Sequence, residues 1–304
     1  MQPRRATALA CAKVNLSLDV GPLRPDGFHD IVSVMQTIGL ADTIVIETTD
    51  RGDVEVTCDA SAIPEWRNHI PTDQQNTAFR AAEAVLLRAG VPIGLRIHIT
   101  KRIPVEAGLG GGSSDAAAVL RAAAALVAWK PDPDALTAAA AEIGSDVPFF
   151  LLGGTALVRG RGEIIAPVPS SPPLPVVIAQ PNCGVSTRDA YDALDRGGGR
   201  RRSDTEAVCD ALSSGKVSAL RDALGNHFET VISNLAPAVL DLMEDMARAG
   251  ASPVRLCGSG SAVFGVADTQ EDARAIADGL RTAYPFAVAS QFVGSTAALA
   301  MVLS

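Results

Sequence analysis

The chain has 304 residues, of which 47% are hydrophobic and 20% charged, a composition typical of a globular protein whose length suits two compact domains. Its formal net charge of −8 argues against a nucleic-acid-binding role, because such a role needs a basic surface. The five cysteines are never spaced C-x-x-C, which argues against a disulfide framework or a zinc site and favours a cytoplasmic protein. No apolar run has the length of a membrane span, and the short apolar stretch near the N-terminus, stopped by Lys13, is not expected to be a signal peptide.

The first predicted element is a strand over residues 10–20, where apolar and polar side chains alternate. This pattern predicts one buried face and one polar face, and the polar face carries Lys13 and Asn15. Further strands are predicted over 42–48, 53–58 and 95–100. Residues 77–89 have the spacing of an amphipathic helix that ends at Gly90.

A glycine-rich segment, PVEAGLGGGSSDAA, begins at Pro104. Alanine-rich helices are predicted over 114–129 and up to Ile143, followed by short apolar strands within 147–163. The proline-rich segment 169–175 is typical of a linker. It predicts an N-terminal domain of residues 1–168 and a C-terminal domain of residues 169–304.

In the second half, predicted strands alternate with predicted helices. The strands cover residues 176–180, 253–257, 262–266 and 287–293, and the helices cover 206–212, 237–249 and 270–284. Because the first half lacks regular β-α-β spacing, the predicted fold class is α+β.

The glycine-rich segment predicts an anion site, because bare main-chain N–H groups there precede a helix N-terminus. No lysine follows the glycines, which excludes a P-loop, and Ser113 stands where a dinucleotide fingerprint needs its third glycine. A glycine-rich hinge that binds nothing is the alternative. Asp115, in the first helical turn, is expected to stabilise the helix N-terminus with its carboxylate turned away from any phosphate.

Two charged residues have competing interpretations. Lys13 is either a solvated lysine on a polar strand face or a ligand-binding group that shares that face with Asn15. Asp146 is either a helix N-cap before Pro148 or a functional carboxylate. The residues alone do not decide between these interpretations.

Three segments resemble the signatures of the GHMP kinases, and they occur in the order of that family: CAKVNLSLDV, PVEAGLGGGSSDAA and CGSGSAVFG. The stretches RPDGFHDI and EIGSDVPFFL extend the resemblance over nearly the whole chain. It implies a two-domain α+β GHMP kinase fold, with a ribosomal protein S5-like N-terminal domain, a ferredoxin-like C-terminal domain and the active site in the cleft between them.

The resemblance also implies that ATP, together with Mg²⁺, donates a phosphoryl group to a small molecule. The glycine-rich segment would wrap the triphosphate, and two further residues would lie near the adenosine. These ATP-binding residues are Pro104, Val105, Glu106, Ala107, Gly108, Leu109, Gly110, Gly111, Gly112, Ser113, Ser114, Lys101 and Asn76. Glu106, Ser113 and Ser114 are equal candidates for contacts to Mg²⁺, and no metal ligand is assigned.

Lys13 and Asp146 match the catalytic lysine and aspartate of the family. By this match, Asp146 would orient or deprotonate the acceptor hydroxyl. Lys13 would keep that carboxylate ionised and would stabilise negative charge on the transferring group.

The form of the signatures implies that the acceptor is the 2-hydroxyl of a cytidine diphosphate-linked methylerythritol, an intermediate of the non-mevalonate isoprenoid pathway. Its cytosine would be held by an aromatic face and an imidazole edge. The implied acceptor-binding residues are Asn15, Phe28, His29, Tyr191, Gly258, Ser259, Gly260 and Ser261. The family usually has tyrosine where this chain has Phe28, a change that keeps stacking but removes any hydroxyl contact.

Two alternatives are open at this point. One is another GHMP kinase, of the homoserine or mevalonate type, and the other is a non-catalytic nucleotide-binding regulator. Neither a nucleic-acid partner nor a membrane is expected, and the sequence does not distinguish a monomer from a homodimer.

Overall fold

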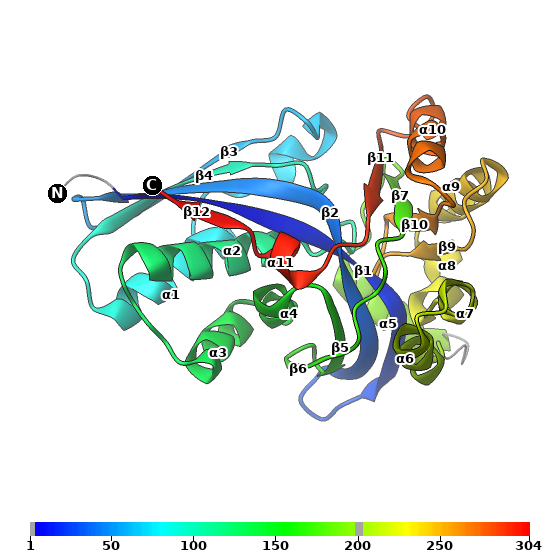
Figure 1. Ribbon diagram of the computed structural model, residues 1–304, viewed down its shortest axis with the longest axis horizontal. Coiled ribbons are helices and arrows are strands. Elements are labelled where there is room, and N and C mark those ends of the chain that lie inside the picture. Colours follow the sequence, from blue (N-terminus) through cyan, green and yellow to red (C-terminus); the bar gives the residue numbers. More distant parts are fainter. Residues whose placement is uncertain (1–3, 198–202) are drawn as a thin grey trace.

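Two β-sheets lie side by side in the computed structural model, which describes residues 4–197 and 203–304 (Figure 1). Within these residues the larger sheet has eight strands, with the central order β12-β1-β2-β4-β3. Its strands are β1 (Arg5–Leu23), β2 (His29–Thr49), β3 (Val54–Asp59), β4 (Gly94–Thr100), β5 (Thr155–Gly160), β6 (Ile164–Pro167), β8 (Gly225–Asn226) and β12 (Met301–Leu303).

The centre of β1 is buried on both faces, whereas the alternating sequence predicts only one buried face. The apolar face, which includes Val14, is fully buried as expected. On the other face, Lys13, Asn15 and Ser17 are no more than 3% exposed. The second half of the chain covers them, because β8 pairs with Ser17 and the Gly258 N–H donates a hydrogen bond to Asn15.

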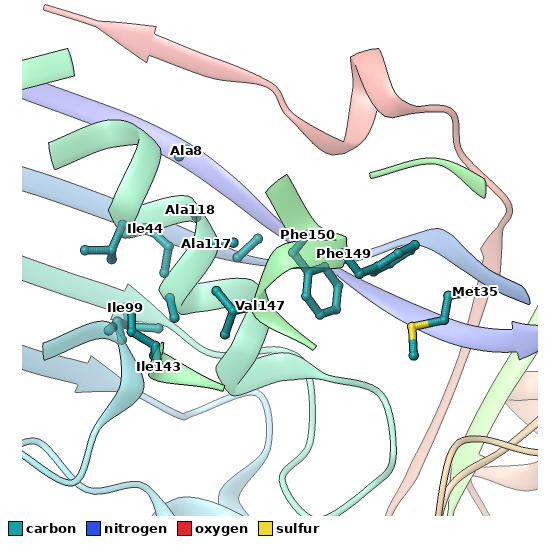
Figure 2. Packing of buried hydrophobic residues seen from close by; sticks show 14 of the residues in the cluster. Ala8, Met35, Ile44, Ile99, Ala117, Ala118, Ile143, Val147, Phe149 and Phe150 are labelled. Carbon is teal, nitrogen blue, oxygen red and sulfur yellow. The ribbon is translucent and has the colours of Figure 1, made fainter. Parts of the chain in front are cut away.

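Four helices lie on one face of the larger sheet (Figure 1). They are α1 (Thr77–Ala89), α2 (Gly111–Leu126), α3 (Pro133–Ile143) and α4 (Val147–Leu152). Helix α2 contributes mainly alanines to the core, and Figure 2 shows Ala117 and Ala118 beside Ile44 of the sheet. Because alanine side chains end at Cβ, the backbone of α2 can pack close to the sheet and the core stays dense.

Local signals place the ends of α1 correctly. The predicted helix over residues 77–89 is confirmed, with Gly90 in the left-handed conformation at its C-terminus. Helix α2 begins at Gly111, three residues before its predicted start, because Gly110 adopts a left-handed conformation (φ 71°) at the N-cap position. The first turn of α2 therefore consists of glycines and serines of the glycine-rich segment.

The prediction of short strands within residues 147–163 is partly wrong. Residues Val147–Leu152 form helix α4, which has Pro148 in its first turn and ends at Gly153. A short apolar run is compatible with a buried strand or a buried helix, and here tertiary packing favours the helix. Phe149 and Phe150 of α4 lie in the core in Figure 2, and β5 and β6 follow as strands.

The smaller sheet has the strand order β11-β7-β10-β9, in which all neighbours are antiparallel. Its strands are β7 (Pro175–Gln180), β9 (Val254–Leu256), β10 (Val263–Val266) and β11 (Phe286–Gln291). Helix α9 (Pro237–Arg248) precedes β9, and α10 (Gln270–Leu280) connects β10 to β11. This β-α-β-β-α-β arrangement confirms the predicted ferredoxin-like topology.

The remaining elements surround the junction of the two sheets. They are η1 (Pro64–His69), α5 (Thr187–Gly197), α6 (Thr205–Ser214), α7 (Val217–Ala223), η2 (His227–Thr230), α8 (Ile232–Leu235) and α11 (Ser295–Ala298). Only α6 among them was predicted. Helix α10 ends four residues before the predicted end at Tyr284. In the described part of the chain, no helix combines the length and apolar character needed to cross a membrane.

The proposed linker, residues 169–175, lies between β6 and β7 and forms no regular structure before Pro175. Strands β8 and β12, which both follow this segment in the chain, pair with β1 of the larger sheet. The domain limits 1–168 and 169–304 stay a prediction.

Candidate active site

A cavity of about 420 Å³ lies where the two sheets meet. Residues of β1, the glycine-rich segment, the start of α4, α5, η2 and the turn after β9 line it. The predicted site residues that line it are Lys13, Asn15, Lys101, residues 104–113, Asp146, Tyr191, Gly258 and Ser259. The cavity therefore brings together the predicted catalytic pair and nearly all of the glycine-rich segment.

The glycine-rich segment needs glycine at two positions, because Gly108 and Gly110 each combine a positive φ with a close contact. Gly108 has a φ of 72°, and a Cβ atom there would lie 1.8 Å from the carbonyl oxygen of Cys257. A Cβ atom on Gly110 would lie 2.7 Å from the ring of Phe150. The bare main chain can therefore pass between the two halves of the molecule and present the free N–H groups of the first turn of α2 to the cavity.

Main-chain hydrogen bonds fasten this segment to both sheets. The Lys13 N–H of β1 donates to the carbonyl of Leu109 (3.0 Å). On the other side, the Ala262 N–H donates to the carbonyl of Ala107 (3.2 Å). The position of the glycine-rich segment is therefore set by both halves of the chain.

Lys13 is a buried cation at the cavity wall. Its ammonium donates to Asn15 Oδ1 (2.7 Å), and the same oxygen accepts the Gly258 N–H (3.1 Å). Asn15 in turn donates to Ser33 Oγ (2.8 Å). Among the described residues Lys13 makes no ion pair, so a positive charge with a neutral partner lines the cavity.

Asp146 occupies the N-cap position of α4, but its side chain makes no capping hydrogen bond. It is half-buried and lines the cavity. The interpretation of Asp146 as a side-chain helix cap is therefore wrong, and its carboxylate is available to a ligand.

His29, Tyr191 and Phe228 form a row of rings, of which Tyr191 and Phe228 line the cavity. The Tyr191 ring lies 5.0 Å from the rings of His29 and of Phe228. Burial, and after it the negative charge of Asp146, raise the pKa of Tyr191 to about 12. Tyr191 therefore lies close enough to Asp146 for the two side chains to interact electrostatically.

Phe28 and His29 do not line the cavity. His29 Nδ1 donates to the carbonyl of Gly21 (2.9 Å), and its Nε2 lies 3.4 Å from an oxygen of Asp195. Phe28 is 49% exposed, and the guanidinium of Arg161 stacks 4.7 Å from its ring centre. Their predicted contacts to cytosine stay predictions.

Several other predicted site residues have structural partners. Asn76 caps α1 by accepting the Ala78 N–H (2.8 Å). The hydroxyl of Ser114 donates to the carbonyl of Cys11 (2.6 Å). Ser261 is fully buried and donates to the carbonyl of Cys183, and neither it nor Gly260 lines the cavity. Their binding roles stay predictions.

The sequence analysis did not identify six residues that line the cavity: Leu18, Ile31, Met35, Thr77, Thr187 and Phe228. The apolar ones look like ordinary core residues in the sequence, so no local signal distinguishes them. Thr77 has a signal, since it follows the N-cap of a predicted helix. Its hydroxyl donates to the carbonyl of Gly112 (2.7 Å), which joins the start of α1 to the glycine-rich segment.

The largest correction concerns Asp115 and Lys101. Contrary to the prediction, Asp115 is not in the first turn of its helix, because α2 begins at Gly111. It is 4% exposed and accepts a hydrogen bond from Lys101 Nζ (2.8 Å). Lys101 Nζ also donates to Asp42 Oδ2 (2.5 Å). Burial alone would lower the pKa of Lys101, but the charges of Asp115 and Asp42 outweigh it and the pKa is raised. Burial raises the pKa of Asp115 to about 8, although Lys101 opposes the shift.

The described residues contain no cluster of three or more His, Cys, Asp or Glu side chains that could hold a metal ion by themselves. Mg²⁺ usually keeps several waters and binds through one or two protein groups together with substrate phosphates. Glu106, Ser113 and Asp146 line the cavity and have oxygen ligands of the required kind. These residues fit an ion that enters with the nucleotide rather than a resident metal.

Asp115→Asn should change how stability depends on pH. Because the folded-state pKa of Asp115 is about 8, above its ordinary value near 3.8, the folded chain keeps a proton that the unfolded chain releases. The stability from this group is complete below the unfolded pKa and is lost as pH rises towards the folded pKa. Between pH 6 and pH 8 the free energy of unfolding of the variant should therefore rise relative to wild type, by up to about 2 kcal/mol.

Urea unfolding of both proteins across this pH range measures the effect. Asp189→Asn, which changes an exposed carboxylate on α5, is the control and should show no such divergence. Parallel pH profiles for Asp115→Asn and wild type would contradict the assigned pKa.

Gly108→Ala should destabilise the fold by about 3 kcal/mol, because it combines a clash with an unfavourable φ. Gly90→Ala is a matched control, since Gly90 also has a positive φ (63°) but no atom within 4 Å of an added Cβ. The control should lose about 1–2 kcal/mol. Equal losses for the two variants in denaturant titrations would show that the contact between Gly108 and Cys257 is not tight.

Comparisons with known proteins agree with this geometry. Residues 76–154 match the family model for the GHMP kinases N terminal domain, and residues 206–285 match the model for the GHMP kinases C terminal. The 4-diphosphocytidyl-2-C-methyl-D-erythritol kinase of Caldicellulosiruptor saccharolyticus is 41% identical over 90% of this chain and 91% of its own length. The Bacillus subtilis enzyme of the same name is 40% identical over 95% of this chain and 98% of its own length.

Solved structures give the same result. A crystal structure of 4-(cytidine 5'-diphospho)-2C-methyl-D-erythritol kinase superposes with a TM-score of 0.80 and 38% identity, covering 95% of this chain and 99% of that chain. A homoserine kinase from Cytophaga hutchinsonii superposes with a TM-score of 0.74 at 20% identity, covering 100% of this chain and 98% of that chain, a similarity of fold alone. The α+β class and the two-domain fold are thereby confirmed, and the chain belongs to the GHMP kinases.

Proposed function

We propose that this chain transfers the γ-phosphoryl group of ATP to the 2-hydroxyl of 4-diphosphocytidyl-2-C-methyl-D-erythritol, in the non-mevalonate route to isoprenoid precursors. The observation that carries the proposal is the identity of about 40% with kinases of that name over nine-tenths or more of the chain. The cavity supports it, because it combines an anion-binding helix N-terminus with Lys13 and Asp146.

The donor side is the glycine-rich segment. The main-chain N–H groups at the start of α2 would hold the triphosphate, with the positive end of the helix dipole behind them. Glu106, Ser113 and Asp146 are the residues that would contact Mg²⁺, which would neutralise phosphate charge when it enters with ATP. Lys101 and Asn76 are proposed to lie near the adenosine.

Phosphoryl transfer breaks the bond from the γ-phosphorus to the β-γ bridging oxygen and forms a bond to the acceptor oxygen, whose proton must leave. Asp146 is the proposed acceptor of that proton or the group that orients the hydroxyl, because its carboxylate is free of capping and lines the cavity. Lys13 is held in place by Asn15, so its charge is positioned before the reaction. Negative charge that develops on the transferred group would be stabilised by this ammonium.

The acceptor side is the ring row together with the turn after β9. Tyr191 would cover the cytosine, and His29 and Phe28 are proposed to contact it. Asn15, Gly258 and Ser259 line the same cavity and would contact the acceptor near its reactive hydroxyl. Gly260 and Ser261 belong to the same turn and would stabilise it without lining the cavity.

The alternatives have weaker support. Homoserine and mevalonate kinases share the fold at only 20% and 16% identity in the superposed structures. A non-catalytic nucleotide-binding regulator does not need a buried lysine and an uncapped aspartate on one cavity wall. The proposal also includes a cytoplasmic location.

The deciding experiment measures ADP release from ATP and Mg²⁺ with purified 4-diphosphocytidyl-2-C-methyl-D-erythritol, and in parallel with homoserine and with mevalonate. Release that depends on the cytidine compound alone is expected. Release that depends on homoserine or mevalonate would replace the proposed acceptor, and no release with any acceptor would favour the regulator.

Asp146→Asn and Lys13→Met should each lower kcat by about 10²–10⁴-fold while calorimetry still detects ADP binding. Asn keeps the size of Asp146 but cannot take a proton, and Met fills the volume of Lys13 without its charge. Asp189→Asn is again the control, because this exposed carboxylate on α5 does not line the cavity. A variant that keeps near-wild-type kcat would remove its residue from the mechanism.

A further inference from the structure

Three buried charged side chains lie directly behind the glycine-rich segment. The Lys101 ammonium is held between Asp42 and Asp115, and the three side chains are 3%, 0% and 5% exposed. Lys101 nevertheless contributes to the wall of the cavity. Burial of two carboxylates and one ammonium costs desolvation free energy, so this charge cluster requires a reason beyond stability alone.

Asp42 has the most partners of the three. Its Oδ2 accepts the Lys101 ammonium, and its Oδ1 accepts the main-chain N–H groups of Arg102 (2.5 Å) and Ile103 (2.9 Å). One carboxylate on β2 thus holds three consecutive residues that lead from β4 into the glycine-rich segment. Asp115 accepts a hydrogen bond from Lys101 alone, and its Oδ1 has no hydrogen-bond partner in the described structure.

Lys101 and Ile103, which Asp42 binds, lie against the first residue of α2. A Cβ atom on Gly111 would lie 3.0 Å from Cγ2 of Ile103 and 3.4 Å from Nζ of Lys101. Gly111 is the first residue of α2, so its main chain rests directly on these two side chains. A shift of Lys101 and Ile103 would therefore move the first turn of α2.

We propose that Asp42 is a positioning residue for the nucleotide: it fixes Lys101 and Ile103, and through them the first turn of α2, against which the triphosphate binds. This inference rests on the proposed use of ATP and extends it to a residue that does not touch the cavity. Because N–H groups bind phosphate only over a narrow range of distances, a small displacement of this turn weakens binding of the donor and not of the acceptor.

The electrostatic balance of the cluster agrees with this role. With both carboxylates ionised, the cluster would carry a net negative charge behind an anion site. A protonated Asp115 makes the cluster neutral, and burial favours that form. Asp42 accepts hydrogen bonds from three donors, and these fix the geometry of its carboxylate.

Asp42→Asn tests the proposal through separate KM values for ATP and for the acceptor. We expect KM for ATP to rise about tenfold, with kcat and the acceptor KM within about twofold of wild type. Met246→Ala is the control for general loss of stability, because Met246 is fully buried on α9 and lies outside the cavity. It should lower the fraction of folded enzyme without changing either KM.

Ile103→Ala is the second variant, which decides the question if Asp42→Asn does not fold. It removes the contact to Gly111 and should produce the same selective rise in KM for ATP. An unchanged ATP KM, or equal changes in both KM values, would overturn the proposal.

Calorimetric titration with ADP measures the nucleotide affinity without turnover. It separates a failure of this inference from a failure of the proposed reaction. If wild type binds ADP but phosphorylates none of the three acceptors, a tenfold weaker affinity of Asp42→Asn for ADP still supports the positioning role, and an equal affinity still overturns it.

Discussion

The rest of the site depends on one constraint, the close passage of a bare main chain between the two halves of the molecule. Gly108 lies against the carbonyl of Cys257 and Gly110 against the ring of Phe150, at distances that leave no room for a Cβ atom. The same absence of side chains leaves N–H groups free to face the cavity. Packing and anion binding thus require glycine at neighbouring positions for separate physical reasons.

Two buried lysines near the glycine-rich segment have different hydrogen-bond partners. Lys101 lies between two carboxylates, whose charges more than offset the cost of its burial. Lys13 has the neutral amide of Asn15 as its hydrogen-bond partner. A cation whose charge is not cancelled attracts a phosphoryl group more strongly than one already paired, which suits Lys13 to the reacting group and Lys101 to the framework.

Local signals in the sequence were sufficient for some elements. Helix α1 was predicted at both ends from its amphipathic spacing and from Gly90, which ends it in the left-handed conformation. Helix α4 was not predicted as a helix, because an apolar run as short as Val147–Leu152 fits a strand equally well. The second buried face of β1 could not be predicted, since the segments that cover it lie about 200 residues or more away in the chain.

In the candidate site, too, some residues could be predicted from the sequence and others could not. The proposed catalytic pair was identified through the resemblance to a family, while Asp42 has no recognisable motif. The positioning role proposed for Asp42 depends on three partners about sixty residues away, which only the fold brings together. Charged residues whose partners are distant in the sequence cannot be assigned from spacing.

Hydrogen bonds between the two halves of the chain allow the proposed donor-binding and acceptor-binding residues to come from different sheets. Hydrogen bonds from Ala262 to Ala107 and from Gly258 to Asn15 join the turn after β9 to the glycine-rich segment and to β1. These bonds use main-chain groups or a buried amide, which have little freedom to move. Because an ångström of misplacement between reacting atoms can cost about a hundredfold in rate, these cross-sheet hydrogen bonds are suited to keeping the proposed donor and acceptor residues in position.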